Sequence, residues 1–207
     1  MITFNWIQKD ECKLEVETYP QTTCKLPKQV QGNEIHICDN LDFLKCNLER
    51  LKDKVKCIYI DPPYNTGQHF IYKDKLHKGK ECKHSKWLSF MYPRLVLARE
   101  LLREDGVIFI SIDDNEQANL RLLMNEIFGE GEFVAELIRQ TRKGGGSMSK
   151  YISSDHDYIL CFAKNKEYLP KMYTEYDEEY IKRYKEEDEN GKFFWDTYAR
   201  NRQGSAN

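Results

Sequence analysis

Apolar runs and amphipathic segments alternate along the middle of this chain. Apolar runs rich in β-forming residues cover 55–60, 107–112 and 158–163, and the first two end at aspartates. Runs of this length are typical of strands that a parallel sheet buries on both faces. Ile35 and Ile37 alternate with polar residues, which predicts a further short strand before the first of these runs.

Helices are predicted between these strands. Apolar side chains recur at spacings of three and four in residues 87–103 and 114–128, and a third helix is predicted over 39–51. An Asp-Gly pair at 105–106 supplies a glycine stop for the helix predicted over 87–103. The order strand, helix, strand, helix, strand predicts the α/β class, with an open sheet whose ligands bind beyond the carboxyl ends of the strands.

Both ends of the chain lack this periodicity. Residues 1–31 are mixed and polar, and they predict an irregular amino-terminal arm. Residues 171–207 are polar and acidic, with eight Asp or Glu between positions 175 and 189. The sequence therefore predicts a central domain over residues 32–170 with an arm before it and a separate segment after it.

Composition narrows the class of protein. The 207 residues carry 32 basic and 34 acidic side chains, a formal net charge of −2, so bulk charge gives no argument for nucleic-acid binding, although a local basic patch is not excluded. No stretch approaches the ~18 to 20 apolar residues of a membrane helix, which predicts a cytoplasmic protein with no membrane partner. The seven cysteines form no C-x-x-C pair and are predicted to be reduced thiols.

The segment Asp61-Pro62-Pro63-Tyr64-Asn65 follows the first buried run directly and is the most informative in the chain. Two consecutive prolines end a central strand, and a proline-rich β-turn with no chemistry is the alternative interpretation. Asp61 can supply a carboxylate and Pro62 a backbone carbonyl fixed by the two proline rings. Two such acceptors can hold an exocyclic amino group while its nitrogen becomes tetrahedral and attacks.

The ring of Tyr64 offers a surface on which a base extruded from a duplex can stack. Positioning and hydrogen bonding suffice for this chemistry, so no metal and no covalent nucleophile are expected. Methyl transfer to carbon 5 of cytosine is excluded, because it needs a cysteine that follows a proline and none of the six prolines precedes a cysteine.

At this turn the chain resembles the amino-group DNA methyltransferases, which transfer the methyl group of S-adenosylmethionine to N6 of adenine or N4 of cytosine. With Thr66-Gly67 added, the motif is similar to the modification (Mod) subunits of type III restriction-modification systems and to related adenine-N6 enzymes of the permuted β class. The segments 32–44, 87–113 and 142–166 also resemble these enzymes. The resemblance implies a Rossmann-like S-adenosylmethionine-dependent methyltransferase fold, and it makes residues 32–170 the catalytic part.

The resemblance also implies roles for individual residues. Asp61, Pro62, Pro63 and Tyr64 are expected to be catalytic, and Asp39 and Asp61 to lie near the cofactor S-adenosylmethionine. Contacts with the target base or DNA are expected from Tyr64, Asn65, Lys73, Lys75, Arg142, Lys143, Tyr151 and Tyr158. Alternatives stay open for several of these: the lysines can lie in a solvated loop, the glycine-rich loop after Lys143 can be a plain linker, and either later tyrosine can belong to the core.

One expected element is missing from the sequence. The family carries a Phe-x-Gly-x-Gly cofactor turn, and the only similar stretch, residues 128–131, has the wrong spacing and follows a helix. We therefore expect a partial, truncated sheet that ends before this turn, with residues 171–207 beginning a target-recognition region or a linker.

The expected function is site-specific methylation of adenine N6 in double-stranded DNA by the modification subunit of a restriction-modification system. A homodimer and a restriction (Res-type) subunit are the expected protein partners. Two alternatives remain: a catalytically silent or partner-dependent remnant that binds DNA or another subunit, and a cytosine-N4 methyltransferase.

Overall fold

The computed structural model describes residues 4–17, 32–66, 82–141, 154–172, 177–189 and 191–194. The chain divides into two compact units, residues 1–170 and residues 171–207. In the second unit, a short helix α5 (Glu178–Ile181) precedes a hairpin of β5 (Glu186–Asp188) and β6 (Gly191–Phe193). The predicted domain boundaries stay a prediction.

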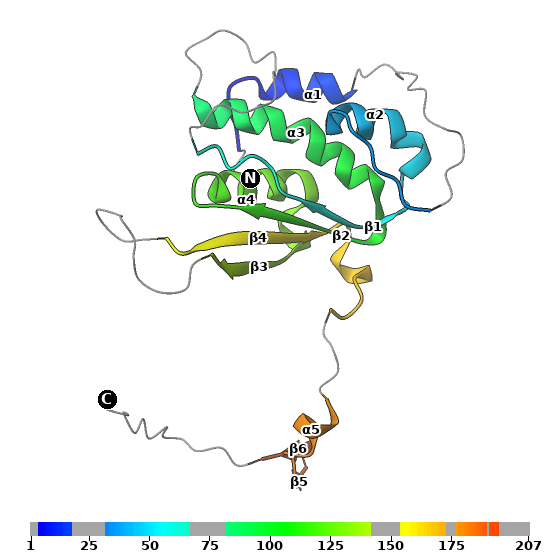
Figure 1. Cartoon of the computed structure of the whole chain (residues 1–207), viewed down its shortest axis with the longest axis vertical. Helices are drawn as coiled ribbons and strands as arrows, with labels where there is room; N and C mark the ends of the chain where they lie inside the picture. Colours follow the sequence, from blue (N-terminus) through cyan, green and yellow to red (C-terminus); the bar gives the residue numbers. More distant parts are fainter. Residues whose placement is uncertain are drawn as a thin grey trace. The chain divides into compact units, whose positions relative to one another are not determined.

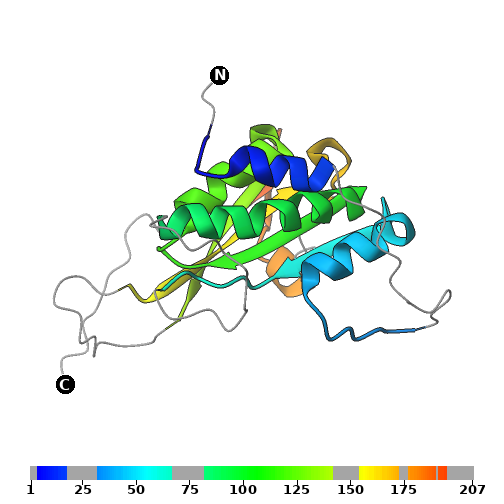
Figure 2. The ribbon, with the colours of Figure 1, turned by 90° about the horizontal axis from the view of Figure 1, so that it is seen from above.

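The first unit is an α/β structure, which confirms the predicted class (Figure 1). Its sheet has the order β1-β2-β4-β3, in which β1 and β2 are parallel and β4 is antiparallel to both of its neighbours. The helices α1 to α4 lie on the same side of this sheet, as the view from above also shows (Figure 2). In chain order the elements are α1 (Lys9–Glu17), α2 (Asn40–Leu51), β1 (Val55–Ile60), α3 (Lys83–Leu101), β2 (Leu102–Ile112), α4 (Gln117–Phe128), η1 (Glu130–Glu132), β3 (Phe133–Gln140), β4 (His156–Ala163) and η2 (Lys166–Tyr168).

The strand prediction is wrong in two places. Ile35 and Ile37 form no strand, and their side chains are 92% and 99% exposed, because no strand in the described part of the chain pairs with them. Strand β3 is missing from the prediction, since it carries Glu136 and Arg139 and becomes exposed along its second half. With β3 present, the chain returns antiparallel into β4, so the sheet is mixed rather than parallel.

The helix limits also differ from the prediction. Helix α3 begins four residues before the predicted start, at Lys83, and gives way to β2 at Leu102, before the glycine that was expected to stop it. Within the predicted irregular arm, α1 is a helix that packs on the first unit: Lys9 is buried and donates to Glu126 of α4 at 2.6 Å. The sequence does not predict this helix, because six of its nine residues are charged and leave little apolar pattern.

Two further observations bear on the sequence predictions. Cys46 is disulfide-bonded, so the prediction of a reduced thiol is wrong at this position, whereas Cys12, Cys38, Cys57, Cys82 and Cys161 are free. None of the helices in the described ranges is long and apolar enough to cross a membrane.

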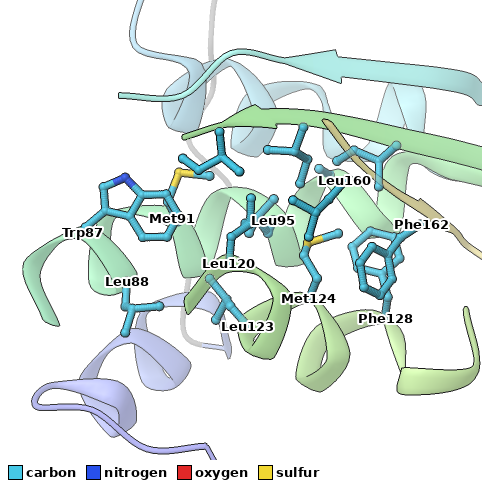
Figure 3. Packing of buried hydrophobic residues seen from close by; sticks show 14 of the residues in the cluster. Trp87, Leu88, Met91, Leu95, Leu120, Leu123, Met124, Phe128, Leu160 and Phe162 are labelled. Atoms are coloured by element: carbon cyan, nitrogen blue, oxygen red, sulfur yellow. The ribbon is translucent and has the colours of Figure 1, made fainter. Parts of the chain in front are cut away.

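The core lies between the sheet and helices α3 and α4. Figure 3 shows Leu95 of α3 and Met124 of α4 packed together, with Leu160 and Phe162 of β4 beside them. The buried residues of α3 occupy most of its circumference, so this helix is enclosed by α1, α2, α4 and the sheet. The sheet and helix α3 therefore form the rigid frame from which the site is built.

From the core we predict that the same Leu→Ala substitution has different effects on stability at two positions. Leu95 is fully buried and Leu122 of α4 is 46% exposed. We expect Leu95→Ala to lower the free energy of unfolding by about 2–5 kcal/mol, because it leaves a cavity. Leu122→Ala should change it by no more than about 0.5 kcal/mol. Urea unfolding followed by circular dichroism measures both values, and equal losses would contradict this assignment of the core.

Candidate active site

The turn that follows β1 lies at the carboxyl end of the parallel pair β1 and β2, where open α/β sheets bind their ligands. Asp61 is exposed, Pro62, Pro63 and Tyr64 are half-buried, and Asn65 is buried. The two prolines stop the strand, because neither can donate to the sheet and both have a fixed φ angle. The turn therefore presents the exposed carboxylate of Asp61 at the end of β1. This strand lies at the edge of the sheet with side chains that are half-buried or exposed, so the prediction that the sheet buries it on both faces is wrong.

Helix α3 fixes the middle of this turn. The indole Nε1 of Trp87 donates a hydrogen bond of 2.7 Å to the carbonyl of Pro63, and the Trp87 side chain is itself buried. A buried indole N–H needs an acceptor, so burial of Trp87 and the position of Pro63 depend on each other.

Asn65 fixes the end of the turn. Its backbone has a φ of 56°, the left-handed region that asparagine tolerates better than most residues. Its side-chain amide donates to the carboxylate of Glu116 and, at 3.3 Å, to the carbonyl of Lys83. Asn65 therefore faces the protein interior. Its contact with the target base or DNA stays a prediction, and the sequence gives no sign of the carboxylate that binds it.

Tyr64 bonds the turn back onto itself and onto the sheet. Its hydroxyl makes hydrogen bonds with Asp61 and with Ser111 of β2, and Ser111 also bonds Tyr59. Burial raises the pKa of Tyr64 to about 12, and the hydrogen bond to Asp61 and its negative charge add to this rise. Tyr64 is thus held by its hydroxyl with its ring against the edge of the core.

A cavity of about 640 Å³ opens beside the turn, a volume in the range of small-molecule sites. Its polar lining includes Asp39, Asn40, Asp61 and Arg94. Its apolar lining comes from α2, β1 and α3, and includes Phe43, Leu44, Ile58, Ile60, Phe90 and Met91. Asp39 and Asp61, which sequence reasoning assigned to the same ligand, therefore line one cavity.

Asp39 is held in this cavity by a buried arginine. The terminal nitrogen Nη2 of Arg94 lies 3.1 and 3.2 Å from the two carboxylate oxygens of Asp39, and Nε of Arg94 donates to Asn40 at 2.7 Å. The guanidinium stacks on the ring of Phe90, 3.6 Å from its centroid. Asp39 also caps α2 by accepting from the N–H of Leu41 at 2.7 Å. These contacts fix the position of the carboxylate in the cavity.

Tyr158 takes part in a second polar cluster, where β4 begins beside the end of β2. Its hydroxyl donates to Asp114 at 2.7 Å, and Ser154 donates to the other carboxylate oxygen at 2.8 Å. Both bonds lower the pKa of Asp114, and the bond to Asp114 raises the pKa of Tyr158. Its role toward a target base stays a prediction. Lys73, Lys75, Arg142, Lys143 and Tyr151 lie outside the described residues.

Three residues of this site were not singled out from the sequence: Trp87 as a support of the turn, Arg94 and Glu116. Arg94 is the one charged residue within the segment 87–98 of α3, and a charge in the middle of this mainly apolar segment is the signal for it. Glu116 lies in the polar run 113–117, which directly follows β2 as Asp61 follows β1. A polar run directly after a strand is therefore a sequence signal from which Glu116 could have been identified.

The raised pKa of Tyr64 predicts a pH dependence of stability. A tyrosine that holds its proton more tightly in the folded state stabilises that state below its ordinary pKa of 10.0, and this contribution disappears as the pH approaches about 12. Between these values the wild type should therefore lose stability more steeply with pH than Tyr64→Phe.

Denaturant unfolding at a series of pH values measures this slope. Tyr168→Phe is the matched control, because it removes a hydroxyl from a ring that is 61% exposed, and it should keep the wild-type slope. Equal slopes for the wild type and Tyr64→Phe would contradict the assignment.

Comparison with known proteins places these features in a family. The DNA methylase family model for N6 and N4 methyltransferases matches residues 55–207. The EcoPI Mod subunit of Escherichia phage P1 is 38% identical over 92% of this chain and 35% of its own length. The StyLTI Mod subunit of Salmonella typhimurium is 44% identical over 69% of this chain and 27% of its own length.

A solved DNA modification methylase from Thermus thermophilus, in complex with S-adenosyl-L-methionine, is 14% identical with a TM-score of 0.46, over 72% of this chain and 60% of that one. The chain spans about a third of the length of the curated relatives named above. Since the family model covers most of the chain, including the turn at Asp61, the chain belongs to the N6/N4 DNA methylase family.

Proposed function

We propose that this chain carries the methyl-transfer turn of a DNA methyltransferase that acts on N6 of adenine, with S-adenosylmethionine as the methyl donor. One observation carries the proposal: the exposed carboxylate of Asp61 lines a cavity of about 640 Å³ that Asp39 also lines, on a turn that Trp87 and Tyr64 hold in place. Membership of the DNA methylase family and the likeness to Mod subunits support it.

The cavity fits S-adenosylmethionine in its chemistry. Asp39 offers carboxylate oxygens to ribose hydroxyls, and Phe43, Ile58 and Phe90 offer apolar walls to an adenine ring. When bound, the cofactor supplies a methyl group on a positively charged sulfur. Asp61, on the same lining, contributes a negative charge that complements it.

The residues of the turn act on the target amino group. The carboxylate of Asp61 and the carbonyl of Pro62 accept hydrogen bonds from its two N–H groups. These bonds favour a tetrahedral nitrogen, whose lone pair is no longer delocalised into the ring of the base. Because Asp61 is exposed, it can pass the released proton to water. The ring of Tyr64 lies on the same turn and can stack on a base that has left the duplex.

The finer features of the proposal come from the relatives. Because these are named as Mod subunits of type III systems, we propose double-stranded DNA as the substrate, a second copy of the chain as a partner, and a Res-type restriction subunit as a further partner. Adenine is preferred to cytosine as the target, because the turn begins with aspartate and the resembled adenine enzymes share this residue.

Replacement of the turn carboxylate tests the reaction. Asp61→Ala should lower methyl transfer from labelled S-adenosylmethionine to adenine-containing duplex DNA by at least about 10²-fold, because one of the two acceptors is lost. Asp105→Ala is the control: it removes a half-buried carboxylate that pairs with Lys56 near the opposite end of the same strands. Full activity of Asp61→Ala would refute the proposed mechanism.

Calorimetric titration of the chain with S-adenosylmethionine tests the cofactor site. Binding should weaken in Asp39→Asn, which removes the charge but keeps a good cap for α2, so the fold is retained. Asp42→Asn, three residues along on an exposed position, should bind as the wild type does. A wild-type chain that binds no S-adenosylmethionine would favour the silent remnant.

A further inference from the structure

A buried carboxylate joins three elements behind the turn. Glu116 lies just before α4 and is fully buried. One of its oxygens accepts from the side chain of Asn65 and from Nδ1 of His84, the latter at 2.7 Å. The other oxygen accepts from the side chain of Asn119 at 2.7 Å. The turn after β1, the start of α3 and the start of α4 therefore meet at one side chain.

Such a group is costly to bury. A carboxylate removed from water needs hydrogen bonds to replace its hydration, and three donors in three elements supply them here. Well-packed apolar side chains often stabilise an interior at least as well as a buried charge. What the carboxylate adds is direction, because each of its oxygens accepts only along its lone pairs.

The direction of the hydrogen bonds to Glu116 matters most at Asn65. This residue holds a left-handed backbone conformation immediately after Tyr64, and the hydroxyl of Tyr64 is bonded to Asp61. Trp87 fixes Pro63 but not the residues that follow it. The bond between Glu116 and Asn65 closes the far end of the turn, so that the segment between Asp61 and Asn65 is held at both ends.

We propose that Glu116 is a positioning residue of the methyl-transfer turn, which acts through Asn65 to set the orientation of Asp61 and Tyr64. The proposal rests on the proposed function. It assigns Glu116 no contact with substrate or cofactor: its effect reaches the reacting atoms only through the geometry of the turn.

Two substitutions separate hydrogen bonding from charge and from packing. Glu116→Met keeps the length and burial of the side chain but removes both acceptors. Glu116→Gln keeps a carbonyl for Asn65 and His84, and its amide can donate to Asn119 once the Asn119 amide has turned over. If Glu116 acts by positioning the turn, Glu116→Gln should retain the activity that Glu116→Met loses.

The expected result is a fall in kcat of about 10²-fold for Glu116→Met, as a small displacement of reacting groups produces, with an unchanged KM for S-adenosylmethionine. Glu116→Gln should keep kcat close to that of the wild type. Thermal unfolding of each variant shows that it is folded. An unchanged kcat in a folded Glu116→Met would overturn the proposal and leave the proposed function intact.

Asn65→Gly tests the same link from the other end, should Glu116→Met not fold. Glycine accepts a φ of 56° but lacks the amide that reaches Glu116, so kcat should fall as for Glu116→Met. A folded Asn65→Gly with unchanged kcat would overturn the proposal.

A readout independent of activity distinguishes the two proposals. The indole N–H of Trp87 donates to Pro63, so its proton resonance, assigned with Trp87→Phe, reports the position of the turn. It should shift in Glu116→Met and not in Glu116→Gln. A wild-type chain with no methyl transfer would refute the proposed function, and the indole resonance would then decide the positioning role: no shift in Glu116→Met would overturn it.

Discussion

The enclosure of helix α3 is the constraint on which the rest of the structure depends. The helix lies between α1, α2, α4 and the sheet, so the buried side chains of Trp87 and Arg94 need hydrogen-bond partners inside the protein. Trp87 finds its partner in the carbonyl of Pro63, and Arg94 finds partners in Asp39, Asn40 and the carbonyl of Phe90. The polar groups of one core helix thereby fix both the turn and the cavity beside it.

The sequence predicts the part of the fold that local chemistry determines. Strand β1 and the turn at Asp61 could be predicted because two prolines stop an apolar run whatever surrounds it. Strand β4 was also predicted from its apolar run, but its antiparallel direction was not. The charged edge strand β3 and helix α1 could not be predicted, because their formation depends on neighbours far along the chain. The same holds within the site. Asp39 and Asp61 stand out by position, whereas Arg94 and Glu116 acquire their roles only through tertiary contacts.

The charges around the turn set a condition on the proposed substrate. Asp61 and Asp114 follow the carboxyl ends of β1 and β2, and Asp157 lies close enough to contribute to the raised pKa of Tyr64. Arg139 pairs with Asp157 and offsets its charge. The carboxylates of Asp61 and Asp114 would still repel a phosphate backbone, whereas they would not repel a neutral base. In the proposed reaction an extruded base therefore approaches these carboxylates while the phosphates stay outside, at positive side chains elsewhere.

The pairing of β3 with β4 continues to the last described residues of that connection, where the N–H of Thr141 donates to the carbonyl of Asp155 at 2.8 Å. This bond closes the ladder at its end, so the strands do not rely on the connecting sequence to stay in register. Loop-closure entropy grows slowly with length, by about 0.6 kcal/mol per doubling. A change in the length of the connection between β3 and β4 would therefore add little to the free-energy cost of folding.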